Sequence, residues 1–63
     1  MTEGLTRRQC EISDLLAKGW TNQEIATELG ISRRTAEQHR AEIFEKMGVR
    51  NAVELTRKLL GAE

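Results

Sequence analysis

Residues 21–36 read TNQEIATELGISRRTA, and their pattern predicts two helices joined by a short turn. Thr21 and Glu24 have the spacing of a capping box, in which each side chain accepts from the other residue's backbone N–H at the start of a helix. Gly30 stands where a left-handed residue would end that helix, and Ser32 is suited to begin the next one. Because the link is only Gly30-Ile31-Ser32, the two helices are expected to meet steeply, as a helix-turn-helix.

Similar signals predict one further helix on each side of this stretch. Two more pairs have the capping-box spacing: Thr6 with Gln9, and Asn51 with Glu54. Glycines follow the other expected helix ends, at positions 19, 48 and 61. We therefore expect helices at about 7–18, 22–29, 33–47 and 52–60. No segment alternates with period two, so the predicted fold is an all-α four-helix bundle with a central helix-turn-helix, a single domain over 1–63.

The spacing of apolar residues predicts which helix faces turn inward. The expected inward side chains are Ile12, Leu15 and Leu16; Ile25, Ala26 and Leu29; Ala36, Ile43, Phe44 and Met47; Val49; and Leu55 and Leu59. The last helix has a second apolar stripe, Val53 and Leu60. Either one stripe packs inward while the other meets a partner, or the first helix covers both.

Composition narrows the possible functions. The chain of 63 residues has one cysteine and one histidine, so neither an internal disulfide nor a cysteine- or histidine-rich metal site is expected. No apolar run approaches the length of a membrane span, and residues 1–5 lack a signal-peptide pattern, so a cytoplasmic protein is expected. There is no nucleophile–base set, paired carboxylate pocket or glycine-rich phosphate loop, so we expect neither an enzyme nor a cofactor.

Charge is segregated along the chain, although the formal net charge is zero. Residues 32–51 contain five basic side chains against three acidic ones, a balance of plus two, whereas residues 21–31 contain only Glu24 and Glu28, a balance of minus two. Arg33 and Arg34 stand in the first turn of the third helix, where the helix dipole disfavours cations. Nearby phosphates would reverse that preference, which favours Arg33 as a phosphate contact.

The third helix has an outward face suited to reading base pairs. Opposite the expected buried stripe lie Arg34, Gln38, Ala41 and Glu45, flanked by Glu37 and Glu42. Arginine can be bidentate to guanine, glutamine can pair with adenine, and glutamate can accept from cytosine. The alternative is a solvated surface on which Glu37 pairs with Arg33 or Arg34 at helical spacing.

Several single residues allow a functional and a plain interpretation. His39 is either a boundary histidine or a phosphate contact, and Cys10 is an ordinary surface cysteine or a redox sensor. Trp20 is a packing residue or a stacking platform for DNA. Arg7 and Arg8 belong to a solvated helix start or touch DNA, while Arg40 either pairs with Glu24 or reaches a phosphate.

These segments, taken in order, resemble the LuxR (GerE) type of DNA-binding domain. The resemblance rests on LTRR at 5–8, LLAKG at 15–19, TNQEIA at 21–26, LGIS at 29–32, Arg34-Thr35 with His39, and KMGVRN at 46–51 with Glu54. It covers residues 5–60, and His39-Arg40 with KMGV is closest to the NarL/FixJ class of response-regulator effector domains.

The resemblance implies a dimeric bacterial transcription regulator that binds an inverted-repeat operator in double-stranded DNA. By position, the base-reading residues fall on Glu37, Gln38 and Ala41, beside Arg34. The phosphate-contacting positions fall on Thr21, Asn22, Gln23, Arg34, Thr35 and Lys46. A homodimer contact through the fourth helix is expected on Ala52, Leu55, Thr56 and Leu59. An N-terminal receiver or sensor domain, or RNA polymerase, is the expected protein partner.

Some residues depart from the family pattern and keep alternatives open. Alanine stands at position 36 where valine is usual, and Glu37 stands where many members have lysine. With the zero net charge, Glu37 favours a second hypothesis, a protein-interaction module of the same fold that has lost DNA affinity. A third is the promoter-recognition domain of a sigma factor, against which the stretch GVRN at 48–51 argues.

Overall fold

The computed structural model of the protein describes residues 4–61, which form four α-helices and, within that range, no strand. The helices are α1 (Arg7–Ala17), α2 (Asn22–Leu29), α3 (Arg33–Met47) and α4 (Ala52–Leu60). This confirms the predicted all-α class and the central helix-turn-helix. The only difference in bounds is that α1 ends at Ala17, with Lys18 as its C-cap. Residues 1–3, part of the stretch compared with signal peptides, lie outside the described range.

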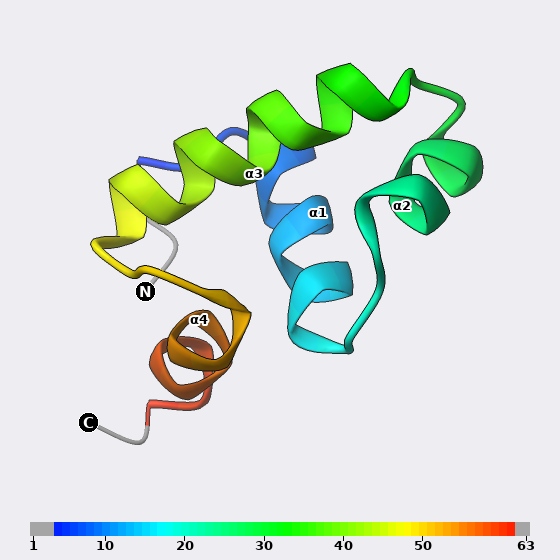
Figure 1. The fold of residues 1–63 in the computed structure, drawn as a ribbon. Helices are drawn as coiled ribbons and strands as arrows, with labels where there is room; N and C mark the ends of the chain where they lie inside the picture. The colour runs from blue at the N-terminus through cyan, green and yellow to red at the C-terminus, as the bar shows by residue number, and fades with distance from the viewer. Residues whose placement is uncertain (1–3, 62–63) are drawn as a thin grey trace.

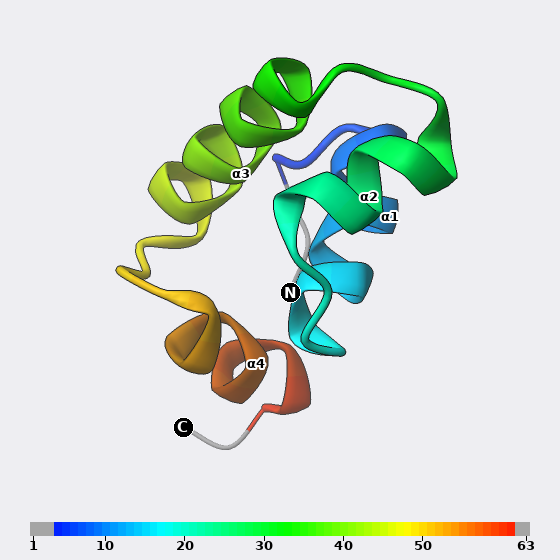
Figure 2. The same cartoon turned by 45° about the vertical axis from the view of Figure 1, so that its right-hand side comes forward.

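The long helix α3 organises the molecule. It packs against α2 and α1, whereas α4 packs against α1 (Figure 1). Turned by 45°, the view again places α4 at the opposite end of the molecule from the turn between α2 and α3 (Figure 2). The start of α3 therefore lies at one end of the molecule, and α4 lies at the opposite end. Within residues 4–61, none of the helices combines the length and apolar character needed to cross a membrane.

Each helix begins at a side chain that accepts from a backbone N–H otherwise left without a partner. At Thr6 and Thr21 both halves of the predicted capping box are present. At Asn51 the box is only half formed, which corrects the prediction. Its side chain accepts from the N–H of Glu54 at 2.9 Å, but Glu54 Oε1 accepts from the N–H of Arg50 at 2.8 Å instead of that of Asn51. The backbone of Asn51 is more extended (φ −156°) than those of the threonine caps, which directs its N–H elsewhere.

The turn between α2 and α3 depends on Gly30. Its backbone is left-handed, with φ 69° and ψ 33°, a conformation that glycine adopts without the steric cost of a Cβ. The next N–H, that of Ile31, donates to the carbonyl of Ala26 at 3.0 Å and so closes the end of α2. Ile31 itself packs against the core. The chain therefore reverses within three residues, and the side chain between the helices fixes their relative position.

The core draws on all four helices. Its buried apolar side chains are Ile12, Leu16, Ile25, Ala26, Ala36, Ile43, Met47 and Leu55. The other expected inward residues, Leu15, Leu29, Phe44, Val49 and Leu59, are partly buried against this core. Two polar side chains that the apolar pattern did not predict are also buried, Gln9 and Ser13. The Ser13 hydroxyl donates to the carbonyl of Cys10 at 2.8 Å, so it is satisfied within its own helix.

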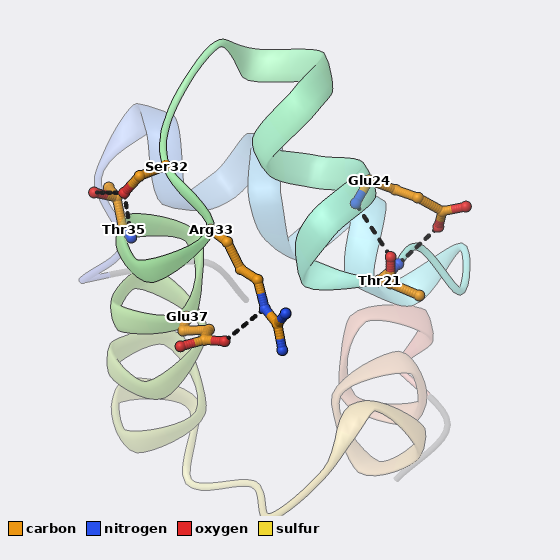
Figure 3. Close-up of polar contacts among 6 residues, drawn as sticks. All are labelled: Thr21, Glu24, Ser32, Arg33, Thr35 and Glu37. Carbon is orange, nitrogen blue, oxygen red and sulfur yellow. Dashed lines mark hydrogen bonds and ion pairs between the residues drawn. The ribbon is translucent and has the colours of Figure 1, made fainter.

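The N-cap of α3 gives a first testable prediction. Ser32 Oγ accepts from the N–H of Thr35 at 3.0 Å (Figure 3). The first turn of α3 contains no acidic side chain that would interact favourably with the positive end of the helix dipole. Replacing Ser32 with alanine should therefore lower the free energy of unfolding by about 0.5–2 kcal/mol. Chemical denaturation measures this loss. Ser32→Asp, which keeps an acceptor at the cap, should stay near the wild type; equal losses in both variants would contradict the capping role.

Candidate nucleic-acid interface

The outward face of α3 carries the four residues predicted to read base pairs. Arg34, Glu37, Gln38 and Ala41 are all exposed, and their spacing of three and four residues places them on one side of the helix. The opposite side is formed by Ala36 and Ile43, both fully buried. Burial of one side therefore fixes the rotation of α3 about its axis and presents the other side to solvent.

One of these residues is already engaged on the surface. Arg33 Nε donates to Glu37 Oε2 at 3.0 Å, while the Arg33 side chain is 66% exposed and that of Glu37 is 45% exposed (Figure 3). An exposed pair of this kind contributes little to stability, at most about 1 kcal/mol. Breaking this pair therefore costs little free energy, and each side chain could then contact a base or a phosphate instead. Of the two pairings considered for Glu37, the structure contains the one with Arg33.

The start of α2 holds three of the predicted phosphate contacts. Thr21 Oγ1 accepts from the N–H of Glu24 at 3.1 Å, and because it acts there as acceptor, its own hydroxyl hydrogen is left to donate (Figure 3). Gln23 is exposed and its Nε2 donates to Thr27 Oγ1 at 3.2 Å. Asn22 is half-buried, with Oδ1 out of contact with solvent and, within residues 4–61, without a hydrogen-bond partner. A phosphate contact from Asn22 would use its amide nitrogen, since the oxygen cannot donate.

Thr35 lies in the first turn of α3. It is half-buried, and its Oγ1 accepts from Ser32 Oγ at 2.9 Å, so its hydroxyl hydrogen also remains available (Figure 3). With Arg33 and Arg34 beside it, the start of α3 offers hydroxyl and guanidinium donors next to the free N–H groups of the helix end. Such a combination is suited to anionic oxygens.

Lys46, the last predicted phosphate contact, is at the other end of α3 and is tied to α1. Its Nζ donates to Gln9 Oε1 at 2.9 Å, and Gln9 Nε2 donates to Glu42 Oε1 at 2.7 Å. The sequence pattern does not predict this cluster, because Gln9 has the spacing of a capping residue and Glu42 flanks the outward face of α3. The available signal was a polar residue, Gln9, three residues before the apolar Ile12 and thus on the same side of the helix.

The residues expected at a dimer contact lie on different sides of α4. Leu55 is fully buried within the chain, so it offers no surface to a partner, which corrects the expectation for this residue. Thr56 Oγ1 donates to the carbonyl of Ala52 at 2.8 Å, and Ala52 and Leu59 are half-buried. The exposed large apolar side chains of α4 are Val53 (63%) and Leu60 (77%). Of the two apolar stripes, Leu55 and Leu59 therefore form the inward one.

The remaining candidates have ordinary surroundings. The guanidinium of Arg40 lies over the Phe44 ring, 4.4 Å from its centroid, and the ion pairs within residues 4–61 do not include one between Arg40 and Glu24. That overturns the pairing considered for Arg40. Trp20 is half-buried against the core, as a packing residue would be. His39 and Cys10 are both half-buried, so Cys10 is less exposed than a surface cysteine was expected to be.

The helix-turn-helix and its exposed α3 face agree with what the chain is similar to. A sequence model described as "Bacterial regulatory proteins, luxR family" matches residues 3–59, nearly the whole chain. The chain belongs to the luxR family. The predicted resemblance is therefore confirmed, and the family is one of regulatory proteins.

Curated relatives narrow the position of the chain within the luxR family. It is 47% identical over 55 residues to the transcriptional regulatory protein UhpA of Escherichia coli, covering 87% of this chain and 28% of that protein. It is 46% identical over 56 residues to the uncharacterized response regulatory protein YgeK of Escherichia coli (89% and 38%). It is 44% identical over 54 residues to the tetrathionate response regulatory protein TtrR of Salmonella typhimurium (86% and 26%). These names agree with the predicted response-regulator class, and the chain spans well under half the length of each relative.

Proposed function

We propose that this chain binds double-stranded DNA in a sequence-specific manner, as part of a bacterial transcription regulator. One observation carries the proposal: a helix-turn-helix holds α3 so that Arg34, Glu37, Gln38 and Ala41 form an exposed face. In a helix-turn-helix the second helix enters the major groove and the first crosses the backbone. The names of the relatives, which describe transcriptional and response regulatory proteins, support the same role.

The positions of the side chains indicate which of them would contact bases and which would contact phosphates. Arg34, Glu37, Gln38 and Ala41 contact base edges, where the first three can hydrogen-bond and Ala41 allows close approach to a thymine methyl. The phosphate contacts are assigned to Thr21, Asn22, Gln23, Arg33, Thr35 and Lys46. Several of these side chains lie at the start of α2 or of α3, so they would fix the register of α3 in the groove.

We further infer that the regulator binds its operator as a dimer through α4. Val53 and Leu60 stand seven residues apart on one side of α4 and are its exposed large apolar side chains, so a second copy would bury surface that water now covers. The other residues expected at this contact lie closer to the chain's own core: Thr56 Oγ1 is 3.5 Å from the carbonyl oxygen of Ala17 in α1, and Ala52 and Leu59 are half-buried. A two-fold contact of this kind matches an inverted repeat with half-sites about one helical turn apart.

The remaining partners lie outside the chain described. Relatives such as UhpA and TtrR are more than three times as long as the segment they share with it. A receiver or sensor domain on the N-terminal side, and RNA polymerase, are the partners we propose for the complete regulator.

A second candidate function is a protein-interaction module that has lost DNA affinity. The zero formal net charge and the Arg33–Glu37 pair favour it, because both reduce the attraction of the α3 start to phosphate. This alternative predicts no salt-dependent DNA binding at all.

Selection of bound sequences from a random duplex library, at low and at moderate salt, tests the proposal. We expect recovery of an inverted repeat, whose half-site spacing gives the dimer geometry. Circular dichroism of the same preparation controls for folding. A folded chain that enriches no sequence at either salt concentration would contradict sequence-specific binding and favour the interaction module.

A further inference from the structure

The side chain of Gln9 lies between two oppositely charged residues of α3. It is 2% exposed. Its Nε2 donates to Glu42 Oε1 at 2.7 Å, and its Oε1 accepts from Lys46 Nζ at 2.9 Å and from the N–H of Thr6 at 3.2 Å. Both lone pairs of the amide oxygen are thus used, and the amide orientation is fixed by a donor on one side and an acceptor on the other.

This arrangement replaces an ion pair that α3 alone would favour. Glu42 precedes Lys46 by four residues, which is the spacing and order that best suits a glutamate–lysine pair on a helix. Within residues 4–61, however, the ion pairs are Arg8–Glu11 and Arg33–Glu37, and Glu42 with Lys46 is not among them. The neutral amide of Gln9 holds each charged group separately.

We propose that Gln9 is a positioning residue that keeps Lys46 available to a DNA phosphate. This inference rests on the proposed function, in which Lys46 contacts the backbone of the duplex. An ammonium group has three N–H donors, and the bond to Gln9 uses one of them. The other two remain for a phosphate, because Glu42 accepts from the amide nitrogen and, within residues 4–61, forms no direct ion pair with Lys46.

The salt dependence of DNA binding measures this effect directly. Each phosphate contact contributes about 0.9 to the slope of log K against log salt concentration. Gln9→Met fills a similar volume but offers no hydrogen bond, so Lys46 is released to pair with Glu42. We expect this variant to lower the magnitude of the slope by up to about 0.9, towards that of Lys46→Ala. Fluorescence anisotropy with a random-sequence duplex supplies the slopes, and circular dichroism identifies the temperature at which every variant is folded.

A matched background separates positioning from a merely structural role. In a chain that already carries Glu42→Gln, no carboxylate is available to capture Lys46, so adding Gln9→Met should leave the slope unchanged. If Gln9 acted only on folding, Gln9→Met would have the same effect in both backgrounds. Should Gln9→Met prove unstable, Gln9→Glu is the second variant: its carboxylate binds Lys46 itself and should lower the slope in both backgrounds.

The possible failures are distinguishable. Equal slope changes for Gln9→Met in the two backgrounds, or no change while Lys46→Ala lowers the slope, would overturn the role of Gln9 and leave the proposed function intact. An unchanged slope for Lys46→Ala would remove Lys46 from the phosphate contacts and overturn the inference. A folded wild-type chain without any salt-dependent binding would overturn the proposed function, and this inference with it.

Discussion

Ile43→Ala is expected to remove a large share of the free energy of unfolding of the chain. Ile43 is fully buried in the C-terminal half of α3. Truncating a buried isoleucine to alanine costs about 2–5 kcal/mol, because apolar contacts are lost and a cavity remains. A domain of this size has a total stability of roughly 3–9 kcal/mol, at about 0.05–0.15 kcal/mol per residue, so the loss is of similar size. Urea denaturation followed by circular dichroism measures the shift of the unfolding midpoint.

Ile43→Val is the matched control for this substitution. It removes a single methyl group and should cost only about 0.5–1.5 kcal/mol. The single tryptophan, Trp20, packs against the same core and gives a second probe by fluorescence. An alanine variant that unfolds at the urea concentration of the wild type would mean that α3 is not held by this contact.

Gln38→Ala should relax the preference for one base pair of the operator half-site. Gln38 is exposed in the middle of the proposed reading face, and a glutamine bidentate to adenine is worth about 1–3 kcal/mol of discrimination. The variant should therefore bind the preferred site more weakly while its affinity for the site altered at that position changes little. Binding to a set of duplexes with single substitutions shows which position is affected. Unchanged preference at every position would exclude Gln38 from base reading.

Gln23→Ala is the control for that measurement. Gln23 has the same side chain and is also exposed, but it lies in the first turn of α2, where a phosphate contact is proposed. Phosphate contacts carry no direct sequence information, so this variant should weaken binding to all duplexes alike. A change of base preference in Gln23→Ala would place α2, and not only α3, in the groove.

The elements that were predicted well depend on residues close together in the chain. The N-cap at Thr21 and the left-handed Gly30 act within a few residues of the helix end that they define. The rotation of α3 was also predictable, because the buried pair Ala36 and Ile43 stands at helical spacing in the sequence. These signals were enough for the helix-turn-helix and for the side of α3 that is exposed. Local signals did not predict that the capping box at Asn51 is only half formed. That outcome depends on the backbone φ of Asn51, which the sequence pattern does not specify.

The remaining features required the tertiary structure, because they join residues that are distant in the chain. Gln9 is 33 residues from Glu42 and 37 from Lys46, so only the packing of α1 on α3 brings the three together. On α4 the sequence left open whether α1 covers one apolar stripe or both, and the structure buries Leu55 of one stripe while Val53 and Leu60 of the other stay exposed. The sequence by itself thus determined the helices, their caps and the family. The tertiary structure decided which charges meet and which apolar side of α4 stays exposed, because both depend on how separate helices pack.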